Sequence, residues 1–209
     1  MSEAAAPLRI GVFGGAFDPP HLAHVALARA AIEQLRLDRL HIVPTGQAWH
    51  KARPLSDAAH RLAMAQLAFA PLAQAVIDES ELRRSGPSYT VDTLTALAAR
   101  HPQAALFLVI GGDQAAALPT WHRWQELFRL ATIAVALRDP STLASDGFFS
   151  EYPALAPFSA RIQRLRLPLM PLSATLIRER IAAGLPVADL LPEPVARYIE
   201  SHHLYAAHV

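Results

Sequence analysis

The sequence contains no cysteine in its 209 residues, which excludes a disulfide-stapled scaffold, thiolate metal sites and a cysteine nucleophile. It also lacks a strong charge of either sign. The formal net charge is +1, so binding of nucleic acid by bulk electrostatics is not expected, and an anionic ligand needs a local cluster of hydrogen-bond donors. The hydrophobic content of 52% excludes disorder as the class of most of the chain.

Long apolar runs are missing as well. The opening MSEAAAPLRI has neither the basic head nor the apolar stretch of a secretory signal. Residues 62–77 form the longest apolar region, and two glutamines and a proline interrupt it, so no transmembrane span is expected. These features predict a single cytoplasmic domain over residues 1–209, with a flexible segment at 1–7 and no membrane partner.

Short apolar runs alternate with helical patterns along the chain. The runs have the length and composition of strands buried on both faces of a parallel sheet: Leu8–Phe13, Leu40–Val43, Ala75–Ile77, Leu106–Ile110, Ile133–Leu137 and, more weakly, Arg161–Leu169. Helical spacing is found in His21–Leu35, Ser56–Phe69, Thr90–Ala99, Thr120–Leu130, Ser173–Ala183 and Pro194–His203. The alternation predicts an α/β fold that is Rossmann-like and doubly wound, with a mainly parallel sheet and helices on both faces.

Two smaller expectations complete this map. Ser56 is the predicted N-cap of its helix, because a hydroxyl can accept a hydrogen bond from a free backbone N–H. Residues 139–160 are rich in proline and serine and are expected to form a long loop or lid.

Glycine is scarce, and its distribution is informative. Five of the nine glycines lie within or just past two predicted strands, namely Gly11, Gly14, Gly15, Gly111 and Gly112. In an open α/β sheet, the carboxyl ends of the strands form the ligand crevice, and glycine lets the backbone approach a ligand closely. Tight turns are the alternative explanation for either group taken alone.

The stretch GGAFDPPHLAH joins the first predicted strand to a helix that begins near His21. A helix start offers unsatisfied N–H groups and the positive end of the helix dipole, so it favours phosphate. His21 and His24 share a helix face, where they can donate hydrogen bonds to oxygens that gain charge in a transition state. Two unrelated surface histidines, or a zinc pair lacking the usual i, i+4 spacing, are the alternatives.

The stretch LSATLIRER predicts a second helix start near the end of the chain. Ser173 stands in the N-cap position, and Thr175 and Arg178 follow within about one and a half turns. A hydroxyl, free N–H groups and a guanidinium can converge there on a second anion. Taken alone, the stretch also fits a capped helix with a solvated arginine.

These two stretches carry a family resemblance. GGAFDPPHLAH resembles the GGTFDPxHxGH signature of bacterial nicotinate-nucleotide adenylyltransferases, and LSATLIRER resembles their ISSTxIR signature. Both signatures belong to the nucleotidyltransferase superfamily that carries the HxGH element. The further stretches HKARPLSDAAHRLAMAQLA, RRSGPSYTVDTL, VIGGDQAAALPTWHRW and LLPEPVARYIESHHLY are similar to segments of the same family. Lys51, Arg61 and Met64 stand in matching places, and the resemblance extends from about Arg9 to Tyr205.

Three positions depart from the family pattern. Ala16 replaces the usual Thr or Ser and removes a hydroxyl, whereas Ala23 replaces the Gly of HxGH and adds a methyl where the nucleotide is expected to pack. The methyl predicts that ATP is shifted slightly or bound more weakly. Ala174 replaces a serine, which matters less because hydroxyls flank it on both sides.

The resemblance implies transfer of AMP from ATP to nicotinate mononucleotide, with deamido-NAD and pyrophosphate as products. Together with the motifs it assigns the catalytic residues His21, His24 and Arg178. The implied ATP-binding residues are Gly14, Gly15, Phe17, Lys51, Gly111, Asp113, Arg138, Ser173 and Thr175, and those for the mononucleotide are Asp18, Tyr89, Thr90 and Trp121. No protein metal site is expected, since Mg²⁺ would arrive bound to ATP. A monomer or small homo-oligomer that binds no nucleic acid is expected.

Alternatives stay open at this stage. Asp18 also fits a turn residue or N-cap, Trp121 also fits the core, and Asp113 also fits a cap of the helix that follows it. Other substrates are conceivable: nicotinamide mononucleotide, or phosphopantetheine, although the phosphopantetheine enzymes are shorter and lack the SYT and LxxW segments. A non-catalytic nucleotide-binding relative is a further alternative. Six further histidines show no convergent spacing: His41, His60, His101, His202, His203 and His208.

Overall fold

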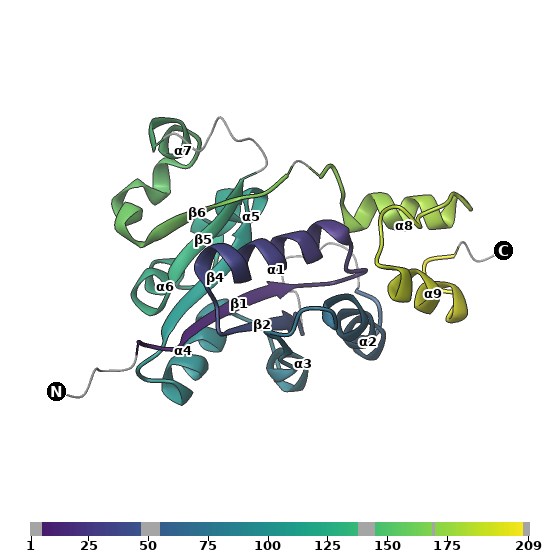
Figure 1. Cartoon of the computed structure of the whole chain (residues 1–209), viewed down its shortest axis with the longest axis horizontal. Helices are drawn as coiled ribbons and strands as arrows, with labels where there is room; N and C mark the ends of the chain where they lie inside the picture. Colours follow the sequence, from purple (N-terminus) through teal and green to yellow (C-terminus); the bar gives the residue numbers. More distant parts are fainter. Residues whose placement is uncertain (1–5, 47–54, 138–144, 169, 207–209) are drawn as a thin grey trace.

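The computed structural model describes residues 6–46, 55–137, 145–168 and 170–206. Within them, six strands form one sheet: β1 (Arg9–Gly15), β2 (Arg39–Pro44), β3 (Ala75–Ile77), β4 (Ala105–Gly111), β5 (Thr132–Leu137) and β6 (Ile162–Arg166). Their order is β3-β2-β1-β4-β5-β6, and every pairing is parallel (Figure 1). This is the doubly wound order, which reverses direction between β1 and β4. The predicted fold class is confirmed, and each predicted strand is present with slightly different ends.

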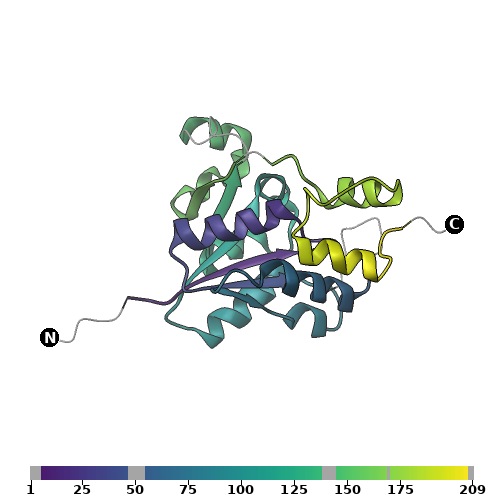
Figure 2. The same ribbon diagram turned by 45° about the vertical axis from the view of Figure 1, so that its right-hand side comes forward.

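Helices cover both faces of the sheet. One hydrophobic cluster joins the sheet to α1 (Leu22–Leu35), α2 (Ala58–Phe69), α8 (Ala174–Ala182) and α9 (Glu193–Ser201). A second cluster, on the opposite face, joins it to α4 (Thr90–Arg100), α5 (Gly112–Ala117), α6 (Trp124–Leu130) and α7 (Ser145–Glu151). The short helix α3 (Ser80–Arg83) and the 3₁₀ segments Leu118–Thr120 and Pro153–Arg161 complete the described elements. Figure 2 shows α9 lying against α2, at the same end of the molecule as α8.

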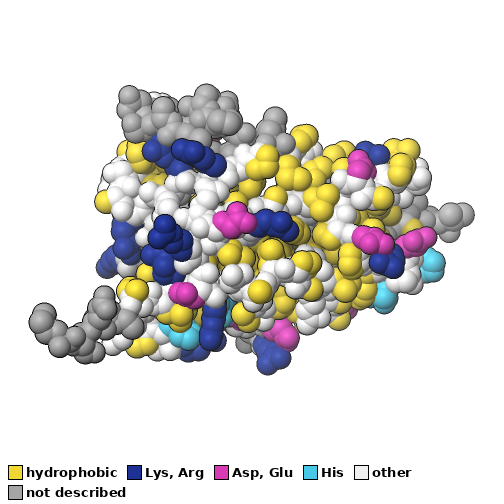
Figure 3. Space-filling model, viewed as in Figure 1, with side chains coloured by type: hydrophobic (Ala, Val, Ile, Leu, Met, Phe, Trp, Pro, Cys, Tyr) yellow, Lys and Arg dark blue, Asp and Glu magenta, His cyan; other side chains and the backbone are white. Residues whose placement is uncertain are grey.

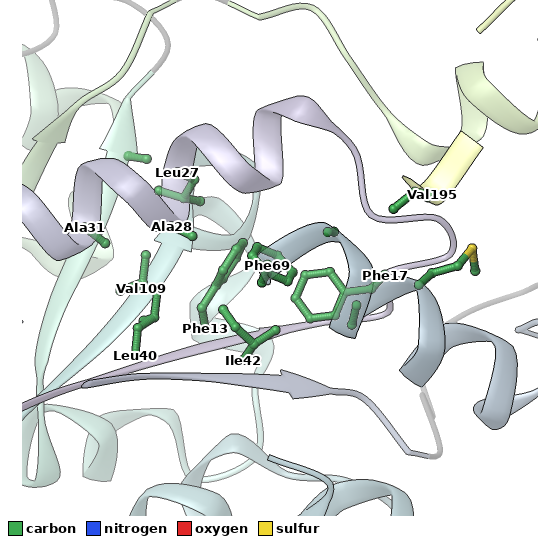
Figure 4. Close-up of a cluster of buried hydrophobic side chains, with 14 of the residues drawn as sticks. Phe13, Phe17, Leu27, Ala28, Ala31, Leu40, Ile42, Phe69, Val109 and Val195 are labelled. Atoms are coloured by element: carbon green, nitrogen blue, oxygen red, sulfur yellow. The ribbon is translucent and has the colours of Figure 1, made fainter. Parts of the chain in front are cut away.

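The alternation of side chains along each strand explains why the strands are apolar almost throughout. In β1, Phe13 belongs to the cluster under α1, whereas Ile10 and Val12 belong to the cluster on the other face. Figure 4 shows Phe13 packed with Phe17 and Phe69 between the sheet and the helices. These rings meet edge to face, with centroids 5.4 to 6.3 Å apart.

Gly11 lies in this core, although it was expected beside the ligand crevice together with Gly14 and Gly15. A Cβ on Gly11 would lie 2.5 Å from Cδ1 of Leu37 and 2.7 Å from Cδ1 of Leu40. The absence of a side chain therefore lets both leucines pack against the middle of β1. The expectation of a ligand-facing glycine is wrong at this position.

Two local expectations are also wrong. Asp57, and not Ser56, caps α2, because its Oδ1 accepts a hydrogen bond of 2.7 Å from the N–H of Ala59. The expected loop at 139–160 contains α7 and the 3₁₀ segment Pro153–Arg161 in its described part, while residues 139–144 lie outside the described residues. Phe148 is fully buried in the second cluster, so tertiary burial stabilises a helix that local composition does not favour.

The surface matches the near-neutral composition. Figure 3 shows both acidic and basic side chains on the viewed face, interspersed with apolar ones. Among the described residues, no helix has the length and apolar character needed to cross a bilayer.

Candidate active site

A cavity of about 430 Å³ opens at the carboxyl ends of β1 and β4, where the strand order reverses. Gly14 and Gly15 end β1 and Gly111 ends β4, and all three line the cavity. A doubly wound sheet binds its ligands in the crevice at this point. The cavity is therefore where the fold predicts a nucleotide.

Two histidines at the start of α1 line the cavity side by side. His21 is the N-cap of α1, and its ring stacks on that of His24 with centroids 3.7 Å apart. The backbone N–H of His21 donates to Nδ1 of His24 at 3.2 Å. Because Nδ1 carries the accepting lone pair, the proton of the neutral ring lies on Nε2. His24 thus offers an Nε2–H donor to a ligand, and the predicted shared face is confirmed.

The core supports His24 from behind. The ring of Phe17 meets the imidazole of His24 edge to face at 5.3 Å, and Phe17 is only 1% exposed. Phe17 has a positive φ of 49°, which few non-glycine residues adopt. A Cβ on Gly15 would lie 3.0 Å from this ring, so Gly15 leaves room for it. Phe17 lines the cavity, as predicted for an ATP-binding residue, and is at the same time a core residue.

The start of α8 forms the opposite wall. Ser173 caps the helix as predicted, since its Oγ accepts a hydrogen bond of 3.1 Å from the N–H of Leu176. Nη2 of Arg178 donates to Oγ1 of Thr175 at 3.0 Å, and Nη1 donates to the backbone carbonyl of Asp18 at 2.8 Å. Ser173 and Arg178 line the cavity, whereas Thr175 does not and instead holds the guanidinium. Residues from the two helix starts, far apart in sequence, therefore line one cavity. Figure 1 shows the start of α8 near the start of α1.

Aromatic and hydroxyl side chains line a further wall of the cavity. Tyr89, Thr90 and Trp121, predicted for the mononucleotide, all lie on it. The ring of Tyr89 stacks on that of His122, with centroids 4.2 Å apart. His122 also lines the cavity, and the sequence analysis missed it because no spacing links a lone histidine to a tyrosine of another segment.

Glu81 is a second cavity residue that the sequence analysis missed. It is buried, and its Oε1 accepts a hydrogen bond of 2.8 Å from the hydroxyl of Thr93. Burial raises the pKa of this carboxyl above its usual value, because a desolvated charge is disfavoured. Asp113 is exposed, stands in the first turn of α5 and lines the cavity, as predicted for a ligand of ATP.

Comparison with known proteins agrees with this geometry. A family model described as cytidylyltransferase-like matches residues 12–180. A protein of Albidiferax ferrireducens named "Probable nicotinate-nucleotide adenylyltransferase" is 59% identical over 197 residues, which cover 94% of this chain and 98% of that one. A protein of Chromobacterium violaceum with the same name is 46% identical over 209 residues, with the same two coverages. The chain belongs to the nicotinate-nucleotide adenylyltransferase family of enzymes.

Solved structures share the fold. The nicotinic acid mononucleotide adenylyltransferase of Plasmodium falciparum, complexed with NaAD, matches with a TM-score of 0.74 and 18% sequence identity, over 95% of this chain and 97% of that one. At this identity the match shows a common fold only. The family membership that the sequence motifs predict is confirmed by the closely similar relatives.

Asp18, within the first signature of the nicotinate-nucleotide adenylyltransferase family, is the centre of a hydrogen-bond network beside the cavity. Asp18 is 2% exposed; its Oδ1 accepts from the hydroxyl of Tyr205 at 2.7 Å and its Oδ2 from the N–H of Ser56 at 3.2 Å. Asp18 also lines the cavity, and its predicted role toward the mononucleotide stays a prediction. Tyr205 was not predicted as a member of this network, because nothing in local spacing relates the segment after α9 to the loop after β1.

Arg61, which stands in the family's R-x-x-M helix, ties three loops together. Its Nη1 donates to the carbonyls of Ala16 at 3.1 Å and Thr45 at 2.7 Å, and its Nε donates to that of Ser56 at 3.0 Å. Burial lowers the pKa of the guanidinium, and the charge of Asp18 opposes this effect. The arginine therefore fixes the loops after β1 and β2 relative to α2.

Two predicted ATP ligands, Lys51 and Arg138, lie outside the described residues. In the described part of the chain, no group of three or more His, Asp or Glu side chains is arranged to hold a metal ion. The predicted residues that line this cavity are Gly14, Gly15, Phe17, Asp18, His21, His24, Tyr89, Thr90, Gly111, Asp113, Trp121, Ser173 and Arg178.

Proposed function

We propose that this chain transfers the adenylyl group of ATP to nicotinate mononucleotide, forming nicotinate adenine dinucleotide and releasing pyrophosphate. The observation that carries the proposal is that His24 and Arg178, from two distant helix starts, line one cavity at the switch point of the sheet. The names of relatives up to 59% identical over almost the whole chain support the choice of substrates.

The reaction depends on alignment of the two substrates and neutralisation of phosphate charge more than on a general acid or base. The 5′-phosphate of the mononucleotide is already an anion at neutral pH, so an oxygen of it can attack the α-phosphorus of ATP directly. The bond from this phosphorus to the bridging oxygen of the β-phosphate breaks, and pyrophosphate leaves with the bonding electrons. No general base or covalent intermediate is required, and the site has to hold the two phosphates in line.

The phosphate side of the site is assigned to the two helix starts. The Nε2–H of His24 would donate to an oxygen of the reacting α-phosphate, because Nδ1 is occupied by the N–H of His21. His21, stacked on His24, would contact the same triphosphate. Arg178 and Ser173 would bind the β- and γ-phosphates and stabilise the departing pyrophosphate, with the guanidinium supplying the charge.

Further positive charge is assigned to two residues outside the described ones and to Mg²⁺, and a hydrogen-bond acceptor to Asp113. Lys51 and Arg138 would add positive charge near the triphosphate, and Asp113 would accept from the ribose hydroxyls or the adenine amine. Mg²⁺ would arrive with ATP and supply charge neutralisation at the phosphates, since this ion keeps mainly water and phosphate oxygens as ligands.

The aromatic wall is assigned to the pyridine. Trp121 would stack on the ring, since an aromatic face and a pyridine favour offset stacking. The segment Tyr89–Thr90 at the start of α4 would supply N–H donors to the carboxylate. Such donors favour a carboxylate over an amide, which is the chemical difference between nicotinate and nicotinamide mononucleotides.

Pyrophosphate release by the purified protein with ATP and each candidate acceptor tests the proposal. We expect turnover with nicotinate mononucleotide to exceed that with nicotinamide mononucleotide, and phosphopantetheine to give none. Trp121→Phe should raise KM for the mononucleotide, whereas the matched control Trp124→Phe, in the core against Phe128 and Phe158, should not. Absence of turnover with both pyridine mononucleotides would refute the assignment.

The proposal also includes a cytoplasmic location and a monomer or small homo-oligomer. Light scattering during size-exclusion chromatography measures the second of these. A large assembly would contradict it.

A further inference from the structure

We propose that Tyr205 is a positioning residue of the active site: its hydroxyl holds Asp18 in place, and Asp18 in turn orients Arg178 toward the triphosphate. The inference rests on the proposed function and adds to it a link between the end of the chain and the catalytic arginine. Tyr205 does not line the cavity, so it acts through other residues.

The first link is the hydrogen bond between Tyr205 and Asp18. The hydroxyl donates to Oδ1 of Asp18 at 2.7 Å, a length typical of a bond to a carboxylate. Burial and the charge of Asp18 raise the pKa of the phenol, so the hydroxyl keeps its proton and acts as a donor. Tyr205 has a φ of 64°, in the left-handed region that non-glycine residues rarely adopt.

The second link passes through the backbone of Asp18. The carbonyl oxygen of this residue accepts from Nη1 of Arg178 at 2.8 Å, while its carboxylate accepts from Tyr205 and from the N–H of Ser56. Asp18 is 2% exposed, so a lost donor cannot be replaced freely by bulk water. A carboxylate that loses the phenol is expected to move toward other donors and to shift its own carbonyl. The guanidinium of Arg178 would then lose its fixed direction.

The position of the last helix does not depend on this bond. Val195 and Ile199 of α9 are buried in the core cluster under α2. The hydroxyl of Tyr198 lies 2.9 Å from Nδ1 of His60 on α2, which gives α9 a tyrosine hydrogen bond of its own, while Tyr205 lies beyond the end of this helix. Tyr205 is therefore not needed merely to hold α9 in place, and this leaves its bond to Asp18 available for a role in the site.

The test compares two matched substitutions, Tyr205→Phe and Tyr198→Phe, each of which removes one hydroxyl and keeps the ring. We expect Tyr205→Phe to lower kcat/KM for ATP by about tenfold to a hundredfold, since a catalytic group displaced by about 1 Å costs this much. Because Asp18 is also a predicted mononucleotide residue, the constants for ATP are measured at saturating nicotinate mononucleotide. Tyr198→Phe should leave all kinetic constants within about twofold. The proposal is wrong if the two variants have the same kinetic constants.

A second variant tests the route through Asp18. Asp18→Asn should lower kcat/KM for ATP, and adding Tyr205→Phe should cause little further loss, because two residues that act through one bond are not additive. Fully additive losses would overturn the route. Urea denaturation of every variant measures whether the substitution has lowered the stability of the folded protein.

Binding of a non-hydrolysable ATP analogue separates this inference from the proposed function. We expect a Kd about tenfold weaker in Tyr205→Phe than in Tyr198→Phe, which corresponds to one lost oriented charge contact. If wild type binds the analogue but turns over no pyridine mononucleotide, the proposed function fails while the positioning role can stand. If wild-type turnover is normal and analogue binding is equal in both variants, the positioning role fails alone.

Discussion

The two ring nitrogens of His24 have different partners, so substitutions can test them one at a time. Nδ1 accepts from the N–H of His21 at 3.2 Å, and Nε2 is the donor assigned to the reacting phosphate. Asparagine can place an oxygen near the position of Nδ1, and glutamine can place an N–H near that of Nε2. Alanine removes both groups.

The magnitudes of the two effects differ enough to be told apart. Loss of one donor that stabilises transition-state charge costs about 100-fold to 1000-fold in kcat. Loss of the hydrogen bond to the helix start costs about 1 kcal/mol in the free energy of unfolding. His24→Ala should show both losses, His24→Asn mainly the loss in kcat, and His24→Gln the loss in stability with more activity than the asparagine variant.

The assay is pyrophosphate release at saturating ATP and nicotinate mononucleotide, with urea denaturation of the same preparations. Saturation matters because the predicted effect is on kcat and not on KM. An asparagine variant with wild-type kcat would remove Nε2 from the mechanism. A glutamine variant no more active than alanine, although folded, would contradict the assignment of the donor.

Three further predictions concern the core, the cavity wall and the hydrogen-bonded pair of His41 and Asp78. Gly11→Ala should lower the free energy of unfolding by about 1–3 kcal/mol, because the new methyl would meet the side chain of Leu37, with kcat unchanged at low temperature. Ala23→Gly should lower KM for ATP, since it removes a methyl from the cavity wall; an unchanged or higher KM would show that the methyl costs nothing. The hydrogen bond with His41 lowers the pKa of Asp78. At a pH above the ordinary pKa of aspartate, the ionised carboxylate therefore stabilises the folded state, and this stabilisation is lost as the pH falls through the lowered pKa. In urea denaturation, Asp78→Asn should therefore be less stable than wild type at neutral pH, with a difference that shrinks in acid; a constant difference would contradict this.

The strands were predictable because a buried parallel strand must be apolar on both faces. Leu106–Ile110 and Ile133–Leu137 have this composition, and they became β4 and β5 with shifts of one residue at their ends. The helix α7 was not predictable in the same way. Its local composition favours a loop, and the burial of Phe148 against the sheet, which stabilises it, depends on residues far away in the chain.

The site residues also divide into those that local sequence predicts and those that depend on contacts between distant segments. The positions of His21, His24 and Ser173 at helix starts follow from local chemistry, since a cap and its N–H groups lie within one turn. His122 and Tyr205 were missed, because the groups that they contact, the ring of Tyr89 and the carboxylate of Asp18, belong to other segments.

The amino-acid sequence by itself determined the six strands, six of the helices between and after them, the two helix starts and the family, because periodicity, capping and signature spacing are properties of neighbouring residues. Only the tertiary structure decided that both helix starts open into one cavity, that Gly11 serves packing, and that Tyr205 reaches Asp18. Those contacts join residues far apart along the chain, and the twist and order of the parallel sheet bring them together.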